Sequence, residues 1–307
     1  MNWDNRPYYS FDFAMKEQFH EKIYKLSIHG GMTCPNRDGT LDDRGCIFCS
    51  GGGSGDFAAD PSLSIQDQVN AQKNLRKNKV TGQHFIAYFQ AFTNTYAPVD
   101  YLRKLFYAAI ELEEVVGLSI ATRPDCLPED VLDLLEELSK IKPVWVELGL
   151  QTIHSNTAEF IRRRYPLSVF DHAVKELSNR RINIVVHTIL GLPGETKAQM
   201  LQTIQYLNFL PISGVKLQLL HVLKNTDLGM FYQEQPFHIF TLEEYIDLVI
   251  NCLEQLSPNI VVHRLTGDGP KSLLLAPLWS TNKKLVLGTL HKELKLRNTW
   301  QGRLFCP

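Results

Sequence analysis

Six short runs of apolar residues recur along the chain, each followed by a segment of mixed character. The runs cover residues 23–29, 85–92, 115–122, 144–151, 182–191 and 215–222. They are rich in valine, isoleucine, leucine and aromatic residues, which is typical of strands buried on both faces of a sheet. The pattern therefore predicts six buried β-strands.

Three segments between these runs have helical periodicity, namely residues 128–140, 168–180 and 195–210. The first opens with Pro128 and two acidic residues, which favour a helix start. Strand-plus-helix units spaced about thirty residues apart indicate a parallel sheet with right-handed crossovers. A barrel-like sheet and a doubly wound open sheet both fit this alternation, so it predicts an α/β fold without fixing its closure.

Polar side chains stand at the carboxyl ends of the predicted strands, where a buried strand interior should exclude them. These residues are Gln90, Thr122, Arg123, Gln151, His187, Gln218 and His221. Barrel-like parallel sheets carry their functional groups at these strand ends and in the loops that follow. We therefore expect a functional site at this edge of the sheet.

The composition is that of a globular protein, with 44% hydrophobic and 10% aromatic residues. No apolar run approaches the roughly 18 residues that a membrane span needs, and the start of the chain lacks the features of a secretion signal. We therefore expect a cytoplasmic protein without a membrane partner.

The net charge of −1 gives no overall signature of nucleic-acid binding. Between Lys283 and Arg303, however, six basic residues accompany one acid, which fits either a phosphate-binding surface or an ordinary solvated helix face.

Three of the six cysteines lie close together after the first predicted strand. Cys34, Cys46 and Cys49 have the spacing C-x11-C-x2-C. Unpaired thiols in a reducing compartment favour a metal site, and C-x2-C pairs occur in both zinc and iron–sulfur sites. Zinc would need a fourth ligand, for which His29 and Cys126 are the nearest candidates. A [4Fe–4S] cluster on three cysteines would keep one iron open, and a metal-free loop is the third interpretation.

Motifs around and beyond this loop carry a family resemblance. In chain order they read KLSIHGGMTCPNRDGT, GCIFCSGGGSGDF, AYFQAFTNTYAP, ATRPDCLP, VELGLQTIH, HTILGLPGET and LQLLHVLKNTDL. With them the chain resembles the radical S-adenosylmethionine (SAM) superfamily, in the branch that includes the Elongator catalytic subunit. Within that branch it is similar to the stand-alone YtqA/YhcC type, over nearly its whole length.

The resemblance implies a partial (β/α)6 barrel of the TIM type. Its parts would be an N-terminal segment (1–22), the barrel core (23–240) and a C-terminal extension packed on the barrel (241–307). It also implies a [4Fe–4S] cluster on the three loop cysteines and SAM at the open iron. Reductive cleavage of SAM would then give a 5′-deoxyadenosyl radical that takes hydrogen from a substrate.

The resemblance further implies a set of residues around the cofactors. They are Phe48, Gln90, Thr122, Arg123, Gln151, Arg163, Leu192 and Val222. Phe48 would shield the cluster, and Arg163 would pair with the SAM carboxylate through its guanidinium. Where many relatives carry Gly-Gly-Glu for the SAM amine, this chain has FQAFTNTYA, so Gln90 and nearby carbonyls would serve instead.

Three residues are candidates for chemistry near the radical or the substrate. They are Cys126, His221 and Lys224, although Cys126 also fits a plain buried thiol. The implied substrate is transfer RNA (tRNA), at the carbon-5 side chain of the wobble uridine, changed from carboxymethylaminomethyl toward aminomethyl. The implied electron donor is a reductant such as flavodoxin or ferredoxin. Two alternatives stay open: a radical SAM enzyme acting on a small molecule or protein, and a non-catalytic module binding zinc or a cluster.

Overall fold

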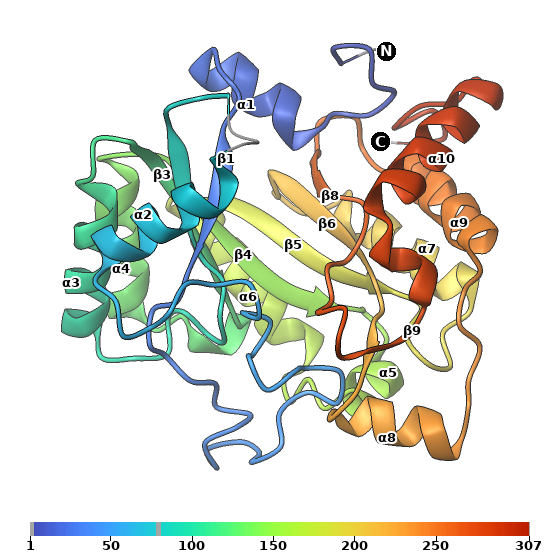
Figure 1. Ribbon diagram of the computed structural model, residues 1–307, viewed down its shortest axis with the longest axis horizontal. Coiled ribbons are helices and arrows are strands. Elements are labelled where there is room, and N and C mark those ends of the chain that lie inside the picture. The colour runs from blue at the N-terminus through green and yellow to red at the C-terminus, as the bar shows by residue number, and fades with distance from the viewer. Residues whose placement is uncertain (1–2, 78–80, 307) are drawn as a thin grey trace.

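The computed structural model describes residues 3–77 and 81–306 (Figure 1). Within them, one curled sheet contains seven strands in the order β1-β2-β3-β4-β5-β6-β8, and all its neighbouring pairs are parallel. The strands are β1 (Tyr24–Ile28), β2 (Phe85–Phe89), β3 (Val115–Thr122), β4 (Val144–Gln151), β5 (Asn183–Leu190), β6 (Gly214–Leu219) and β8 (Val261–Arg264). A short antiparallel pair, β7 (Val222–Leu223) with β9 (Leu274–Ala276), lies apart from it.

The six strands predicted from the apolar runs are all present, and the expected α/β partial barrel is confirmed. The seventh strand, β8, was not predicted. Its four residues, VVHR, include two polar ones and form no apolar run. This strand comes from the segment 241–307, so the part of the chain expected to pack on the barrel also contributes to its sheet.

Helices connect the strands and cover the convex face of the sheet (Figure 1). The described helices are α1 (Phe11–Phe19), α2 (Ile65–Arg76), α3 (Val99–Ile110), α4 (Glu129–Ser139), α5 (Ser155–Phe160), α6 (Leu167–Asn179), α7 (Lys197–Leu207), α8 (Asp227–Glu234), α9 (Leu242–Gln255) and α10 (Lys283–Leu296), with 3-10 turns at Pro124–Cys126 and Leu278–Thr281. The helices predicted over 128–140, 168–180 and 195–210 correspond to α4, α6 and α7. No helix among the described residues is long and apolar enough to cross a lipid bilayer.

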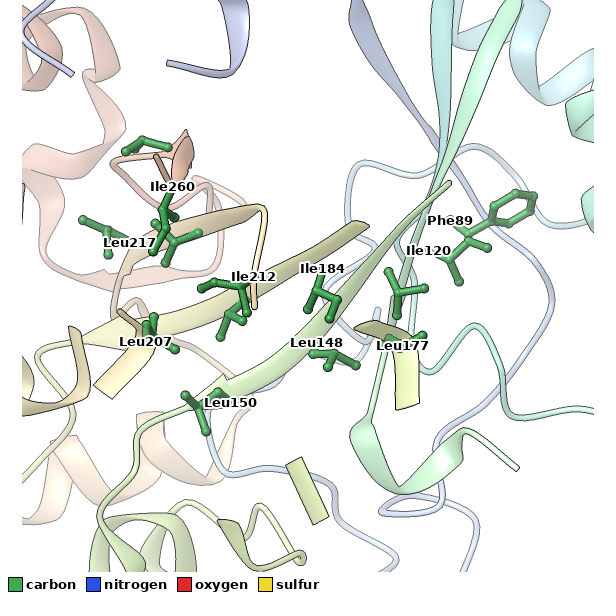
Figure 2. Close-up of a cluster of buried hydrophobic side chains, with 14 of the residues drawn as sticks. Phe89, Ile120, Leu148, Leu150, Leu177, Ile184, Leu207, Ile212, Leu217 and Ile260 are labelled. Carbon is green, nitrogen blue, oxygen red and sulfur yellow. The ribbon is translucent and has the colours of Figure 1, made fainter. Parts of the chain in front are cut away.

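The main core lies between the sheet and these outer helices. Alternate strand residues such as Leu148 and Leu217 point outward, where they meet helix residues such as Leu177 and Leu207 (Figure 2). Alternation of side chains along each strand therefore sends the other half of the residues to the concave face.

The concave face is closed at its amino end by helix α1 (Figure 1). Ala14 and Met15 of α1 pack there against Ile23, Trp145 and Val185, which makes an apolar floor. The loop that carries the three cysteines lies at the opposite, carboxyl end of the strands. The functional site is thus confined between an apolar floor and a cysteine-bearing loop.

Truncation of a phenylalanine on α6 tests this packing. Phe170 is fully buried, whereas Phe209, just after α7, is 78% exposed. We expect Phe170→Ala to lower the free energy of unfolding by about 3–5 kcal/mol, because it leaves a cavity in the main core. The matched Phe209→Ala should change it by less than about 0.5 kcal/mol. Urea denaturation measures both, and equal losses would contradict this description of the core.

Candidate active site

A cavity of about 160 Å³ lies at the carboxyl ends of the strands, against the cysteine loop. Its wall includes all three loop cysteines. Of the residues expected around the cofactors, six line it as well: Phe48, Gln90, Thr122, Arg123, Gln151 and Arg163. The polar strand ends identified in the sequence therefore meet the thiols in one space.

The thiols of Cys46 and Cys49 are partly desolvated. Burial raises the pKa of Cys46 to about 12, and the neighbouring Cys49 adds to this rise. Burial also raises the pKa of Cys49, although Arg37 opposes the effect. Thiols of this kind are protonated at neutral pH and release protons when they bind a metal.

Cys34, Cys46 and Cys49 come together in the wall of one cavity. Among the described residues, no group of three His, Cys, Asp or Glu side chains could hold one metal ion. A [4Fe–4S] cluster binds each cysteine through a different iron, so its ligands need not converge on one point.

Two glycines let the cysteine loop lie close against the end of β2. Gly53 has a φ of +57°, and a Cβ there would come within 2.3 Å of the Phe92 ring. A Cβ on Gly55 would lie 2.4 Å from that of Ala91. Gln90 completes this junction, since its Nε2 donates to the Ser54 carbonyl at 2.8 Å. Side chains larger than hydrogen would push the loop, and its cysteines, away from the cavity.

Gln151 has the features of a ligand-binding residue. Its φ is +67°, an uncommon conformation for a residue with a side chain, and one that concentrates at functional sites. Within the described part of the chain, its buried Oε1 has no hydrogen-bond partner. Gly149 leaves room for the Gln151 amide, because a Cβ there would lie 2.8 Å from Nε2. An unpaired acceptor in the cavity wall suits a ligand that carries an amino or hydroxyl donor, as SAM does.

Arg163 lies in the cavity wall, but its contacts differ from the role that we expected. Its Nη1 donates to the carbonyls of Leu150 and Thr152 at 2.9 and 2.5 Å, and Nε and Nη2 both donate to the carbonyl of Tyr165. A two-point grip on a carboxylate would require some of these buried bonds to break. The hydrogen bonds of Arg163 therefore stabilise the turn after β4. Arg123, which lies over the same Tyr165 ring as Arg163, is paired with Asp125 at 2.6 Å.

Five of the expected site residues do not line the cavity. Leu192 and Val222 pack in a separate apolar cluster behind Phe48. His221 bonds Ser280 at 3.0 Å, and burial lowers its pKa to about 4. The other two are Lys224, which is exposed, and Cys126, a buried thiol whose pKa burial raises to about 12. Loop residues that follow a strand have no fixed side-chain direction, so a role of these five residues near the cofactors or the substrate stays a prediction.

A charged layer inside the barrel was missed altogether. Glu147, on β4, is fully buried and accepts from Lys25 of β1 at 2.6 Å, from Ser119 of β3 at 2.6 Å and from Lys216 of β6. His187 of β5 lies 2.6 Å from the same carboxylate. The sequence held a signal, because the apolar runs around Lys25, Glu147 and Lys216 each contain one charged residue at mid-strand.

The electrostatics of this layer are dominated by burial. Burial alone would raise the pKa of Glu147, but Lys216 and Lys25 hold it well below its usual range. Burial lowers the pKa of Lys216 to about 7, although Glu147 opposes this. The pKa of His187 falls to about 4 through burial and the charge of Lys216. At neutral pH the layer thus contains an ionised carboxylate and a neutral imidazole.

The comparisons with known proteins define the class of this fold and site. The family model of the radical SAM superfamily matches residues 43–207, and that of the Radical_SAM C-terminal domain matches residues 212–296. The chain therefore belongs to the radical SAM superfamily. It is an enzyme of the kind that uses a [4Fe–4S] cluster and SAM and needs a reductant.

Its particular place is the stand-alone branch that resembles the Elongator catalytic subunit. The chain is 43% identical to YtqA of Bacillus subtilis, covering 97% of this chain and 92% of that protein. It is 35% identical to YhcC of Escherichia coli, covering 89% and 87%. The archaeal Elp3 of Methanocaldococcus infernus superposes with a TM-score of 0.68 at 15% identity, covering 91% of this chain and 64% of that one. At that identity the likeness to Elp3 is one of fold.

Removal of one loop thiol should prevent cluster assembly. After anaerobic reconstitution we expect about four irons per chain in the parent protein, the content of one [4Fe–4S] cluster. Cys46→Ala should lose most of this iron, while Cys306→Ala, at an exposed thiol outside the cavity, should keep it. Iron and sulfide analysis measures the outcome, and full iron content in Cys46→Ala would exclude Cys46 as a ligand.

The bonds of Arg163 make a separate prediction for the protein without cofactors. Arg163→Met should lower the free energy of unfolding by about 1.5–3 kcal/mol or more, because three buried carbonyls lose a charged donor. Arg44→Met, at a side chain that is 66% exposed, serves as the matched control and should have little effect. Urea denaturation without SAM distinguishes the roles. If Arg163→Met leaves the free energy of unfolding unchanged, these bonds do not stabilise the fold, and binding of SAM is the better explanation for Arg163.

Proposed function

We propose that this radical SAM enzyme modifies tRNA at the carbon-5 side chain of the wobble uridine, taking carboxymethylaminomethyl to aminomethyl. The observation that carries the proposal is the Elongator-like fold across 91% of the chain. It is supported by 23% identity to the tRNA uridine(34) acetyltransferase of Methanocaldococcus jannaschii. That match covers 54% of this chain and 31% of that protein, so the two share only part of their architecture.

We further propose that Cys34, Cys46 and Cys49 hold the cluster and leave one iron for SAM. Gln90, Thr122, Arg123 and Gln151, with Phe48 beside the thiols, would line the SAM site. When bound, these cofactors supply the radical that removes hydrogen from a substrate. The protein's own residues position the cofactors and keep water from the site.

The basic cluster between Lys283 and Arg303 is only partly available to RNA phosphates. Lys283, Arg297 and Arg303 are paired with the acids Asp268, Asp247 and Glu254. Lys284, Lys292 and Lys295 are exposed on helix α10. These three lysines supply the sequence-independent attraction that nucleic-acid binding requires.

A groove beside these lysines also offers an aromatic surface. It has a volume of about 780 Å³ and is lined by Lys295 and Trp300, together with Arg6 and His291. A half-exposed indole next to basic groups suits stacking on an unpaired base. Tyr165, by contrast, is buried and donates its hydroxyl to the Gly149 carbonyl, so it belongs to the cavity wall.

Nucleoside mass spectrometry of tRNA from a strain lacking this gene tests the proposed substrate. We expect carboxymethylaminomethyl uridine to accumulate and aminomethyl-derived nucleosides to fall, because the enzyme would no longer connect the two. Expression of the parent protein should restore the profile, and expression of Cys46→Ala should not.

An unchanged wobble-uridine profile would overturn the tRNA assignment. It would favour the alternative of a small-molecule or protein substrate for the same radical chemistry. In that case, replacing Lys284, Lys292 and Lys295 together should have no effect on activity toward the true substrate.

A further inference from the structure

A second chamber opens beside the candidate SAM cavity. It has a volume of about 620 Å³ and lies between the two edge strands of the sheet, β1 and β8. Four residues line both spaces: Tyr88, Gln90, Lys216 and Arg264. The chamber is thus a lateral entrance whose inner wall is also the wall of the SAM cavity.

Cationic side chains outnumber acidic ones around this chamber. Lys25, Arg76, Lys216 and Arg264 line it, whereas Asp268 is the one acid in its lining. Inside the barrel, the Glu147 carboxylate forms salt bridges with two lysines, Lys25 and Lys216. The chamber therefore faces one lysine more than its internal carboxylate can neutralise.

Arg264 adds a further positive charge, and only one carboxylate lies near it. Its register partner across the β6–β8 pair is Lys216, so two positive residues sit side by side. Its guanidinium lies 3.6 Å from Asp268, but Asp268 is held at 2.5 Å by Lys283. The carboxylate nearest to Arg264 is thus already engaged.

This surplus has an energetic consequence. The side chains of Lys216 and Lys25 are only 4% and 15% exposed, and a buried charge without a counter-ion is costly. Burial lowers the pKa of Lys216 to about 7, which shows how poorly the site stabilises the second ammonium. A ligand with negative charge would supply the missing compensation.

We propose that the lateral chamber binds an anionic group of the substrate, a carboxylate or a phosphate, on Lys216 and Arg264. The substrate would then be fixed at the wall that the chamber shares with the SAM cavity. The anion site stands on the geometry of the chamber, and only the identification of the anion with part of a tRNA rests on the proposed function.

The first experiment uses small anions and needs no RNA. Acetate and inorganic phosphate, compared with chloride at equal ionic strength, should raise the melting temperature of the parent protein because they bind the folded state. Arg264→Ala and Lys216→Met should each weaken this binding about tenfold or more, since each removes a charged donor. Lys104→Ala, at an exposed lysine of helix α3 outside both the chamber and the basic cluster, should bind like the parent.

Glu147→Gln should change anion binding in the opposite direction. With its internal counter-charge removed, the chamber should bind acetate or phosphate more tightly than the parent protein. Circular dichroism verifies that each variant is folded, and Arg264→Ala, at a half-exposed edge position, keeps the test usable if the buried variants are not. Equal anion binding in the parent and Arg264→Ala proteins would overturn the proposal.

The second experiment identifies the source of the anion and separates this inference from the proposed function. Dissociation constants are measured for tRNA bearing a carboxymethylaminomethyl, an aminomethyl or no wobble side chain. If the side-chain carboxylate is bound, Arg264→Ala weakens only the first tRNA. If an RNA phosphate is bound, Arg264→Ala weakens the binding of all three tRNAs alike.

Two outcomes would contradict one of the two proposals. If Arg264→Ala weakens the binding of none of the tRNAs that the parent binds, the chamber is not the substrate's anion site. If the parent binds no tRNA, the proposed function fails while the small-anion result still decides whether the site exists.

Discussion

The buried carboxylate of Glu147 is the interaction on which the concave side of this protein depends. It connects β4 with Lys25 of β1, Ser119 of β3, His187 of β5 and Lys216 of β6. Lys216 extends the connection to β2, because its Nζ donates to the Tyr88 hydroxyl at 3.0 Å. Six neighbouring strands thus meet at one carboxylate, and although burial would raise its pKa, Lys216 and Lys25 hold that pKa well below its usual range.

This charged layer lies between two different parts of the concave face. Below it, α1 and the amino ends of the strands form an apolar floor, and above it the polar strand ends meet the cysteine loop. The bonds of this layer join the strands across the concave face. Glu147, His187 and Lys216 also line the cavity, so they give its wall ionic and polar groups.

Much of this arrangement followed from the sequence. The apolar runs predicted six of the strands because strands buried on two faces leave a continuous hydrophobic signal. The polar strand ends Gln90, Thr122, Arg123 and Gln151 met in one cavity because parallel strands end at a common edge. The three closely spaced cysteines indicated a metal or iron–sulfur site, and the motifs around them indicated the family.

The remainder could not be predicted, for identifiable reasons. The strand β8 is short and half polar, so nothing in VVHR distinguishes it from a loop. His221 and Lys224 follow the end of β6, where side-chain direction depends on tertiary contacts such as the bond to Ser280. Arg163 lies in the cavity wall, but nothing in the sequence indicated that its donors would also bind backbone carbonyls. The sequence shows which hydrogen-bonding groups a residue has, but the tertiary structure decides which partners those groups bind.

The most direct measurement for this account is electron paramagnetic resonance of the reduced, reconstituted protein with and without SAM. Three protein ligands should leave one iron open, so SAM should change the signal of the reduced [4Fe–4S] cluster, and 5′-deoxyadenosine should form. A cluster signal that does not respond to SAM, or bound zinc in place of iron, would contradict the assignment of this cavity.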